Sequence, residues 1–480
     1  MLQFEGVNYS IEKYYNRCEF YKFTEFIPHF MKKFWLNCLL ATTFVFALMW
    51  ALSQVTDLQL FNAFDPINQA LSDFELTDYA FSNLRPDPLV DERIILVNIG
   101  NIPRAAIAQQ IRIISQYKPK VIGIDGYFNC EGGLRDTLNC PQLLDTLGNL
   151  LLSNAIREAG NVVLVSKLLQ SSSLSNSGVI DVYDSMEFSD PMFQDIAESG
   201  YANLPTDARY QEDVKICRSF IPRVALKGKE ELAFAVKIAM LFDSVKTKKI
   251  LSRNKGEELI NYRGNIEIQD VKIKSLRSKD LSTTKYPVMF YALDVDQVFR
   301  EEFLPEMIKD KIVIFGYLGQ YFGDPSWNDK FFTPMNNKVA GRANPDMFGL
   351  VIHANILSMV LNGDFINEIA EWHKYLIAFI FCYFNMALFF YINAKFPVWF
   401  DSLSLLVQLT QIILLMGFTI WIFSRSTFKL DLTLTLVTIA LAGPCFQFYN
   451  NVLTSLVRIW HNKLTNRKNQ VLTTQNQDIS

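Results

Sequence analysis

The sequence predicts an α/β domain that is held at a membrane by apolar helices on both sides of it. Four uncharged apolar runs lie near the two ends of the 480-residue chain. Each is long enough for a helix to cross ~30 Å of hydrocarbon. The long stretch between the first and second runs has an ordinary globular composition and contains alternating strand-like and helix-like segments. The runs are Phe34–Ser53, Tyr375–Ala394, Ser402–Phe423 and Leu432–Asn450.

Basic residues beside the runs indicate how the chain is oriented. Lys33 precedes the first run, Lys395 lies between the second and third, and Arg467 follows the fourth. Short basic flanks tend to stay in the cytoplasm, so we expect both termini inside and the large domain outside. The expected parts are a cytoplasmic segment 1–33, a span 34–53, an extracytoplasmic domain 54–371, spans 375–394, 402–423 and 432–450, and a cytoplasmic tail 451–480.

The first run also has the look of a signal peptide, because Ala51-Leu52-Ser53 resembles a small-residue cleavage site. Its length and the long segment before it favour an uncleaved anchor.

Four short runs in the outer domain are apolar on both faces, as in buried parallel strands. Helix-like segments follow the first two, at Arg104–Tyr117 and Leu143–Ala159. This β-α-β-α-β order implies right-handed crossovers and a three-layer sandwich around a mostly parallel sheet. The expected strands are Arg93–Ile99, Val121–Ile124, Val162–Val165 and Ile312–Phe315.

The rest of the outer domain is predicted more coarsely. Glu231–Phe242 and Asp294–Ile308 resemble helices, and Gly349–Leu361 resembles a closing helix that runs on toward the membrane. The irregular stretch Leu168–Tyr291 is expected to form a side lobe or insertion.

Cysteines and charge exclude some classes of site. Cys130 and Cys140 bracket a short loop and are expected to pair in an oxidising compartment, with Cys217 left over. No C-x₂-C spacing is present, so we expect no metal site. The net charge is −3 and no basic run occurs in the outer domain, which argues against nucleic acid as a partner.

Polar residues at expected strand ends are candidates for ligand binding. Asp125 ends a strand, where loops of parallel sheets form the usual ligand crevice, and could bind a cation or a hydroxyl; a helix cap or turn is the alternative. Gly316 and Gly319 follow another strand end and would let the backbone approach a ligand, although a structural loop is the alternative. They lack a nucleotide-binding fingerprint.

Three later residues complete the candidate ligand site. Asp329 and Thr333 lie in DKFFTP, and either ligand binding or a fixed turn would explain them. His353 lies among apolar helix residues, where packing is the alternative to a ligand or pH role. We expect Asp125, Asp329 and His353 to share one pocket. No catalytic constellation is apparent.

The spans contain amides and no central charges, so ion transport lacks its usual residues. Gln408 and Gln411 share one helix face, which would contact either a partner helix or the rest of the bundle.

Several segments together resemble the type-2 CHASE family of extracytoplasmic sensory domains, found in bacterial cyclases, histidine kinases and serine/threonine kinases. The order of one span, a domain and three spans is also similar to that family. The resemblance implies a sensor. No kinase or cyclase motif follows the last span, which is a departure from the family pattern. The segments are Leu84–Gly100, Lys118–Phe128, Ile260–Asn265, Lys309–Gly319, Asp329–Pro334 and Phe348–Gly363.

The expected function is therefore a receptor without enzymatic activity or cofactor in a bacterial cytoplasmic membrane. It would bind a small molecule or an envelope protein and act on a separate protein partner. The alternative is a structural or docking subunit of an envelope assembly, which passes no signal.

Overall fold

A computed structural model describes twelve stretches of the chain: residues 34–52, 78, 80–81, 84–85, 87–129, 145–170, 183–205, 216–266, 288–324, 326–336, 345–452 and 455. The chain forms two compact units. One comprises Met1–Pro66, Glu368–Thr419 and Leu430–Ser480, and the other comprises Ile67–Asn367 and Ile420–Lys429.

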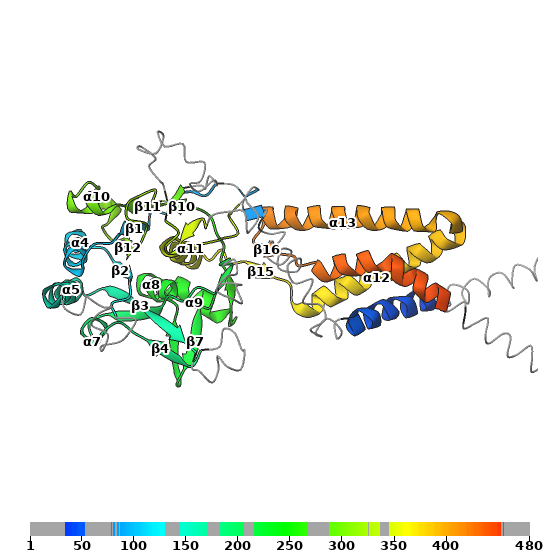
Figure 1. The fold of residues 1–480 in the computed structure, drawn as a ribbon, viewed down its shortest axis with the longest axis horizontal. Coiled ribbons are helices and arrows are strands. Elements are labelled where there is room, and N and C mark those ends of the chain that lie inside the picture. Colours follow the sequence, from blue (N-terminus) through cyan, green and yellow to red (C-terminus); the bar gives the residue numbers. More distant parts are fainter. Residues whose placement is uncertain are drawn as a thin grey trace, which may run out of the picture. The chain divides into compact units, whose positions relative to one another are not determined.

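A mixed, mostly parallel sheet forms the centre of the second unit (Figure 1). Its strands are β1 (Ile94–Asn98), β2 (Val121–Asp125), β3 (Val162–Leu169), β4 (Ser185–Glu187), β5 (Glu198–Tyr201), β10 (Asn265–Ile266), β11 (Val288–Leu293) and β12 (Ile312–Gly316). The order is β10-β11-β1-β12-β2-β3-β4, with β5 also beside β3. Only the β3–β4 pair is antiparallel among these described strands.

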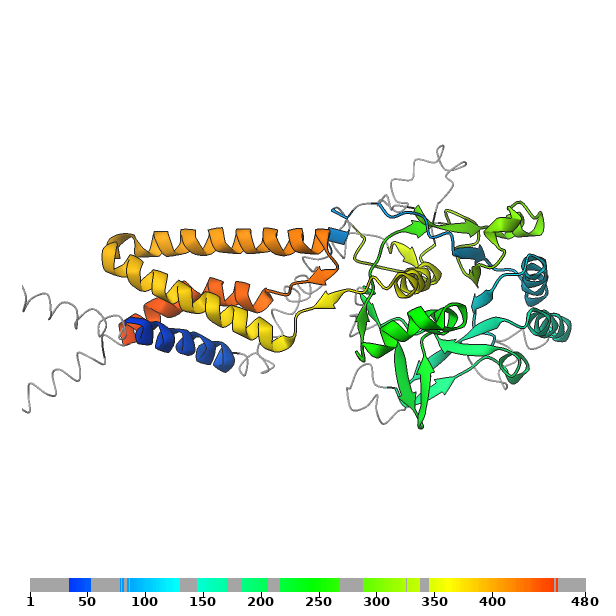
Figure 2. The same ribbon diagram turned by 180° about the vertical axis from the view of Figure 1, so that it is seen from behind.

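Helices pack on both faces of this sheet (Figures 1 and 2). Alternate strand residues enter two different cores: Ile95 and Val97 one, Ile94 and Leu96 the other. The first core includes α4 (Arg104–Gln116), α5 (Thr146–Ala159) and α10 (Val295–Phe299), and the second includes α8 (Phe234–Phe242), α9 (Ser244–Ser252) and α11 (Gly349–Asn362). Burial on both faces is why these strands are continuously apolar.

Two predicted helices are shorter than expected. The segment Asp294–Ile308 contains α10 and a separate 3₁₀ turn, η4 (Pro305–Met307), because Glu301 adopts a left-handed conformation with φ 54° and Pro305 follows. Glu231 lies in a hairpin of β7 (Arg223–Leu226) and β8 (Lys229–Leu232), and α8 begins only at Phe234.

The expected irregular lobe contains regular elements as well. In addition to β4, β5, β7, β8, α8 and α9 it holds α7 (Pro191–Gln194), β6 (Ser219–Phe220) and β9 (Glu258–Leu259). The remaining short strands of the chain are β13 (Lys330–Phe331), β14 (Met347–Phe348), β15 (Asn367–Glu368) and β16 (Phe428–Lys429).

Three helices in the described part of the chain are long and apolar enough to span a membrane. They are Phe34–Leu52, α12 (Glu371–Lys395) and the helical segment Pro397–Arg425, which combines η5 (Pro397–Trp399) with α13 (Phe400–Arg425). Residues 433–452, which overlap the fourth predicted run, are also helical. Cys38, Cys382 and Cys445 are buried in an apolar core of this unit, as expected for packing residues.

Candidate functional site

Asp125 and Gly316 lie side by side at the carboxyl edge of the sheet. β2 and β12 are parallel and in register there, so that the last residue of one strand is opposite the last residue of the other. Asp125 is partly buried, and this desolvation raises the pKa of its carboxyl group to about 7. Asp125 is the last residue of β2, as the sequence analysis predicted. Its role in ligand binding stays a prediction.

Asp329 reaches the same edge on the loop between β12 and β13. Its backbone adopts φ 55°, and its carbonyl accepts a hydrogen bond of 3.0 Å from the amide of Gly349 at the start of α11. Desolvation and the nearby charge of Asp125 both raise the pKa of Asp329. Asp329 is exposed, so solvent screens this repulsion. No ion pair joins either carboxylate to a basic residue in the described part of the chain.

Gly349 packs closely against the side chain of Asp329. A Cβ atom added there would lie 3.3 Å from both carboxylate oxygens of Asp329. The start of α11 is therefore in direct contact with the candidate site, and its amino terminus favours a negative charge.

His353 lies one turn further along α11, inside the apolar layer. It is 4% exposed, and its ring meets Phe234 edge-on at 5.4 Å. Burial lowers the pKa of His353 to about 4, so the ring is neutral near pH 7. Its contacts are those of a packing residue, and its place in a shared pocket with the two carboxylates stays a prediction.

Thr333 is buried and uses its polar groups within the protein. Its amide and hydroxyl donate to the two carboxylate oxygens of Asp346, at 2.8 and 2.6 Å, and Asn336 also donates to Asp346 at 3.2 Å. These bonds join Thr333 and Asn336 to Asp346, the residue just before β14, which favours the architectural interpretation of the motif.

The glycine loop after β12 has a steric reason for its glycines. Gly319 adopts φ +99°, and a Cβ atom there would lie 2.7 Å from Cβ of Asp324. A Cβ atom on Gly316 would lie 2.8 Å from a methyl group of Leu350 in α11. These glycines thus allow close packing against Asp324 and α11. The close approach of this backbone to a ligand stays a prediction.

Asn98, which the sequence analysis missed, holds that loop in place. It ends β1 and is fully buried. Its Oδ1 accepts from the amides of Gly100 and Leu318 at 2.9 Å each, and its Nδ2 donates to the carbonyl of Gly319 at 3.0 Å. The available signal was the same as for Asp125, a polar residue at the end of a buried strand.

Other predicted sites fall elsewhere. Cys130 and Cys140 lie outside the described residues, so their pairing stays a prediction, and Cys217 is buried in the core. Among the described residues, no group of three or more His, Cys, Asp or Glu is arranged to hold a metal ion.

Gln408 is buried inside the membrane unit. Its amide donates to the carbonyls of Ile439 and Ala440 at 2.6 and 3.2 Å, so it contacts a neighbouring helix of the same chain. Gln411 lies on the same helix, partly buried. A contact with a partner protein at these residues stays a prediction.

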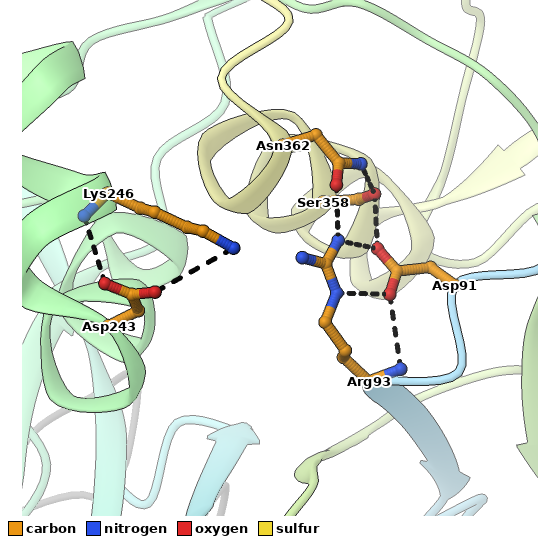
Figure 3. Close-up of polar contacts among 6 residues, drawn as sticks. All are labelled: Asp91, Arg93, Asp243, Lys246, Ser358 and Asn362. Carbon is orange, nitrogen blue, oxygen red and sulfur yellow. Dashed lines mark hydrogen bonds and ion pairs between the residues drawn. The ribbon is translucent and has the colours of Figure 1, made fainter.

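The opposite, amino edge of the sheet carries a cluster of paired charges (Figure 3). Arg93, just before β1, donates to both oxygens of Asp91 at 2.8 and 2.7 Å. Ser358 and Asn362, in the last turns of α11, bond to Asp91 at 2.6 Å and to Arg93 at 2.7 Å. Burial alone would raise the pKa of Asp91, but the hydrogen bonds from Arg93 and Ser358 lower it. Across from this cluster, Asp243 caps α9 through Lys246.

The model of the CHASE2 domain family matches residues 43–388 of this chain. The chain belongs to the CHASE2 domain family. No curated protein and no solved structure matches it. CHASE2 domains are sensory domains, as the resemblance implied. The matched part contains the whole sheet and every candidate residue at its carboxyl edge.

Proposed function

We propose that this CHASE2 protein is a membrane-anchored sensor that binds its ligand at the carboxyl edge of the sheet. The observation that supports this most directly is the pair of carboxylates, Asp125 and Asp329. Each has a raised pKa, and one raises the other. A cationic ligand would offset the repulsion between the two carboxylates, and a hydroxyl-bearing ligand would donate hydrogen bonds to them, whether it is a small molecule or a group on an envelope protein. Perturbed titratable groups in such a place are typical of functional sites.

The proposal includes the finer architecture and the compartment. The domain would be a three-layer sandwich outside the bacterial cytoplasmic membrane, and four spans would form a bundle with both termini in the cytoplasm. The basic flanks at Lys33, Lys395 and Arg467 support this orientation. The domain would have no catalytic activity and would pass its state to a separate partner by contact.

The experiment is a thermal-shift titration of the full-length protein in lipid nanodiscs. The probes are calcium chloride, spermidine and N-acetylglucosamine, which represent a metal cation, an organic cation and a hydroxyl-rich ligand. One probe should raise the midpoint of unfolding, because ligand at 100-fold its Kd adds about 2.7 kcal/mol of stability. Asp125→Asn and Asp329→Asn should abolish that rise.

Asp296→Asn is the matched control, since Asp296 is a highly exposed carboxylate in α10. It should keep the wild-type response. A response that persists in both edge variants, or no response to any of the three probes, would contradict the proposed ligand site. Stoichiometric co-purification with an envelope protein and no response would favour the docking-subunit alternative.

A further inference from the structure

Three chain segments that connect the domain to predicted spans meet at one side chain. We propose that Arg85 is a joint that couples these segments, so that they move together. The segments are 78–85, which follows the first span in the sequence; 363–367, between α11 and α12; and 420–429, which includes the end of α13. All three belong to the same compact unit as the sheet.

Arg85 packs between aromatic rings of two of these segments. Its guanidinium carbon lies 4.5 Å from the ring centre of Phe81 and 4.8 Å from that of Phe423. The two rings also meet edge-on at 5.1 Å. Phe423 is 1% exposed, so this end of α13 is part of the domain core. Cation–π contacts of this kind are strongest where the cation is desolvated.

The same guanidinium reaches the third segment through one buried amide. Arg85 donates to Oδ1 of Asn261, and Nδ2 of Asn261 donates to the carbonyl of Asp364 at 2.7 Å. Asn261 is 1% exposed, so water cannot replace its hydrogen-bond partners. Desolvation, and then the nearby Arg263, lower the pKa of Arg85 to about 10, which leaves it positively charged at neutral pH.

Three further hydrogen bonds hold the segment 363–367: one joins it to 420–429, and two come from Arg253. The amide of Asn367 donates to the carbonyl of Thr427 at 2.8 Å. Arg253, which ends α9, donates to Oδ1 of Asn367 at 2.9 Å and to the carbonyl of Ile366 at 3.1 Å. Asp364, Ile366 and Asn367 are thus each hydrogen-bonded to residues outside the segment 363–367.

Helix α11 links this joint to the candidate ligand site. It begins at Gly349, whose amide donates a hydrogen bond to Asp329, and ends at Asn362, followed by Gly363 and Asp364. If the proposed function is correct, a change at the carboxyl edge would reach all three segments through one rigid helix. The coupling itself is a property of the protein without ligand.

The test is a double-mutant cycle read by amide hydrogen exchange on the full-length protein in nanodiscs. The variants are Arg85→Lys, which keeps the charge and removes the planar group, Phe423→Leu, and both together. Each single variant should speed exchange in both 363–367 and 420–429 by about tenfold. The double variant should exchange no faster than the faster single variant, because either change breaks the same joint.

Arg112→Lys, at an exposed ion pair with Glu158, is the control and should change neither segment. Protection of β1 and β12 shows that each variant is folded; if Phe423→Leu loses it, Phe423→Met replaces that variant. Additive effects in the double variant, or an Arg85→Lys effect confined to 78–85, would overturn the inference. No ligand is used, so this result is independent of the thermal-shift titration.

Discussion

The two edges of the sheet differ in whether their carboxylates are paired with a basic residue. At the amino edge, Asp91 and Arg93 form a two-point ion pair, and α11 supplies a hydrogen bond to each of them. At the carboxyl edge, Asp329 lies close enough to Asp125 for the charge of Asp125 to raise its pKa, and no described basic residue is paired with either. The same helix, α11, contacts the paired cluster with its last turns and Asp329 with its first residue, Gly349.

This difference separates architecture from candidate function. A desolvated charge is costly unless an opposite charge and hydrogen bonds compensate it, and the amino edge supplies both. The carboxyl edge leaves one partly buried carboxylate, Asp125, without an opposite charge, an arrangement that a bound ligand would stabilise. Removal of a charge should therefore lower the stability at Asp91, on the amino edge, and raise it at Asp125, on the carboxyl edge.

The largest effect is expected at the amino edge. Asp91→Asn should destabilise the protein by about 3 kcal/mol, because it leaves Arg93 partly buried without its carboxylate. The measurement is the urea-unfolding free energy of the full-length protein in detergent. Arg112→Gln, which removes an exposed ion pair, should cost about 0–1 kcal/mol. Similar losses in the two variants would show that the cluster is no more than surface charge.

His353 should produce a loss of stability in acid. Its folded pKa, about 4, is below the ordinary value of 6.5, so protonation favours the unfolded state. Its contribution to stability is complete above pH 6.5 and is lost as the pH falls toward 4, by about 3 kcal/mol. His353→Gln should lack this loss in unfolding measurements between pH 4 and 8. Wild-type and variant curves that run parallel would contradict the assignment.

The glycine loop should be sensitive to a single methyl group. Gly319→Ala combines a left-handed φ with a Cβ only 2.7 Å from Asp324, and should cost about 2–3 kcal/mol. Gly228→Ala is the matched control, since its φ is +81° but nothing lies within 4 Å of the added Cβ. It should cost only about 1–2 kcal/mol, from the backbone alone. Equal losses in unfolding measurements would mean that the loop can move away from the new methyl group.

Much of the sheet was predictable from local composition. β1, β2, β3 and β12 were expected because each is apolar on both faces, a pattern that needs no partner to be recognised. β11 was missed although its sequence, VMFYAL, is apolar throughout, because it overlaps the stretch Leu168–Tyr291 that was expected to form a side lobe. The place of β12 between β1 and β2 depends on pairing between residues far apart in the chain, which a single sequence does not encode in any short pattern.

Two signals in the sequence indicated the candidate site: the motif DKFFTP, which contains Asp329, and the rule that a polar residue at the end of a buried strand marks a site. That rule found Asp125, and applied consistently it would also have found Asn98. It gives no information about partners, so it could not show that Thr333 is bonded to Asp346, or that Arg85 lies between two rings. Such contacts depend on which distant segments the fold brings together.

The smallest predicted effect is the one that tests the contrast between the edges most directly. The folded pKa of Asp125, about 7, is above its ordinary value of 3.8, so the charged form destabilises the fold. This destabilisation grows as the pH rises from about 4 to 7 and is complete above it. Asp125→Asn should therefore stabilise the protein at pH 8, by about 1–2 kcal/mol after allowance for solvent screening, and should have little effect at pH 4. Urea unfolding at both pH values measures this, with Asp296→Asn expected to change neither. A loss of stability at pH 8 would mean that the Asp125 carboxylate already has a partner, and the two edges would then follow the same rule.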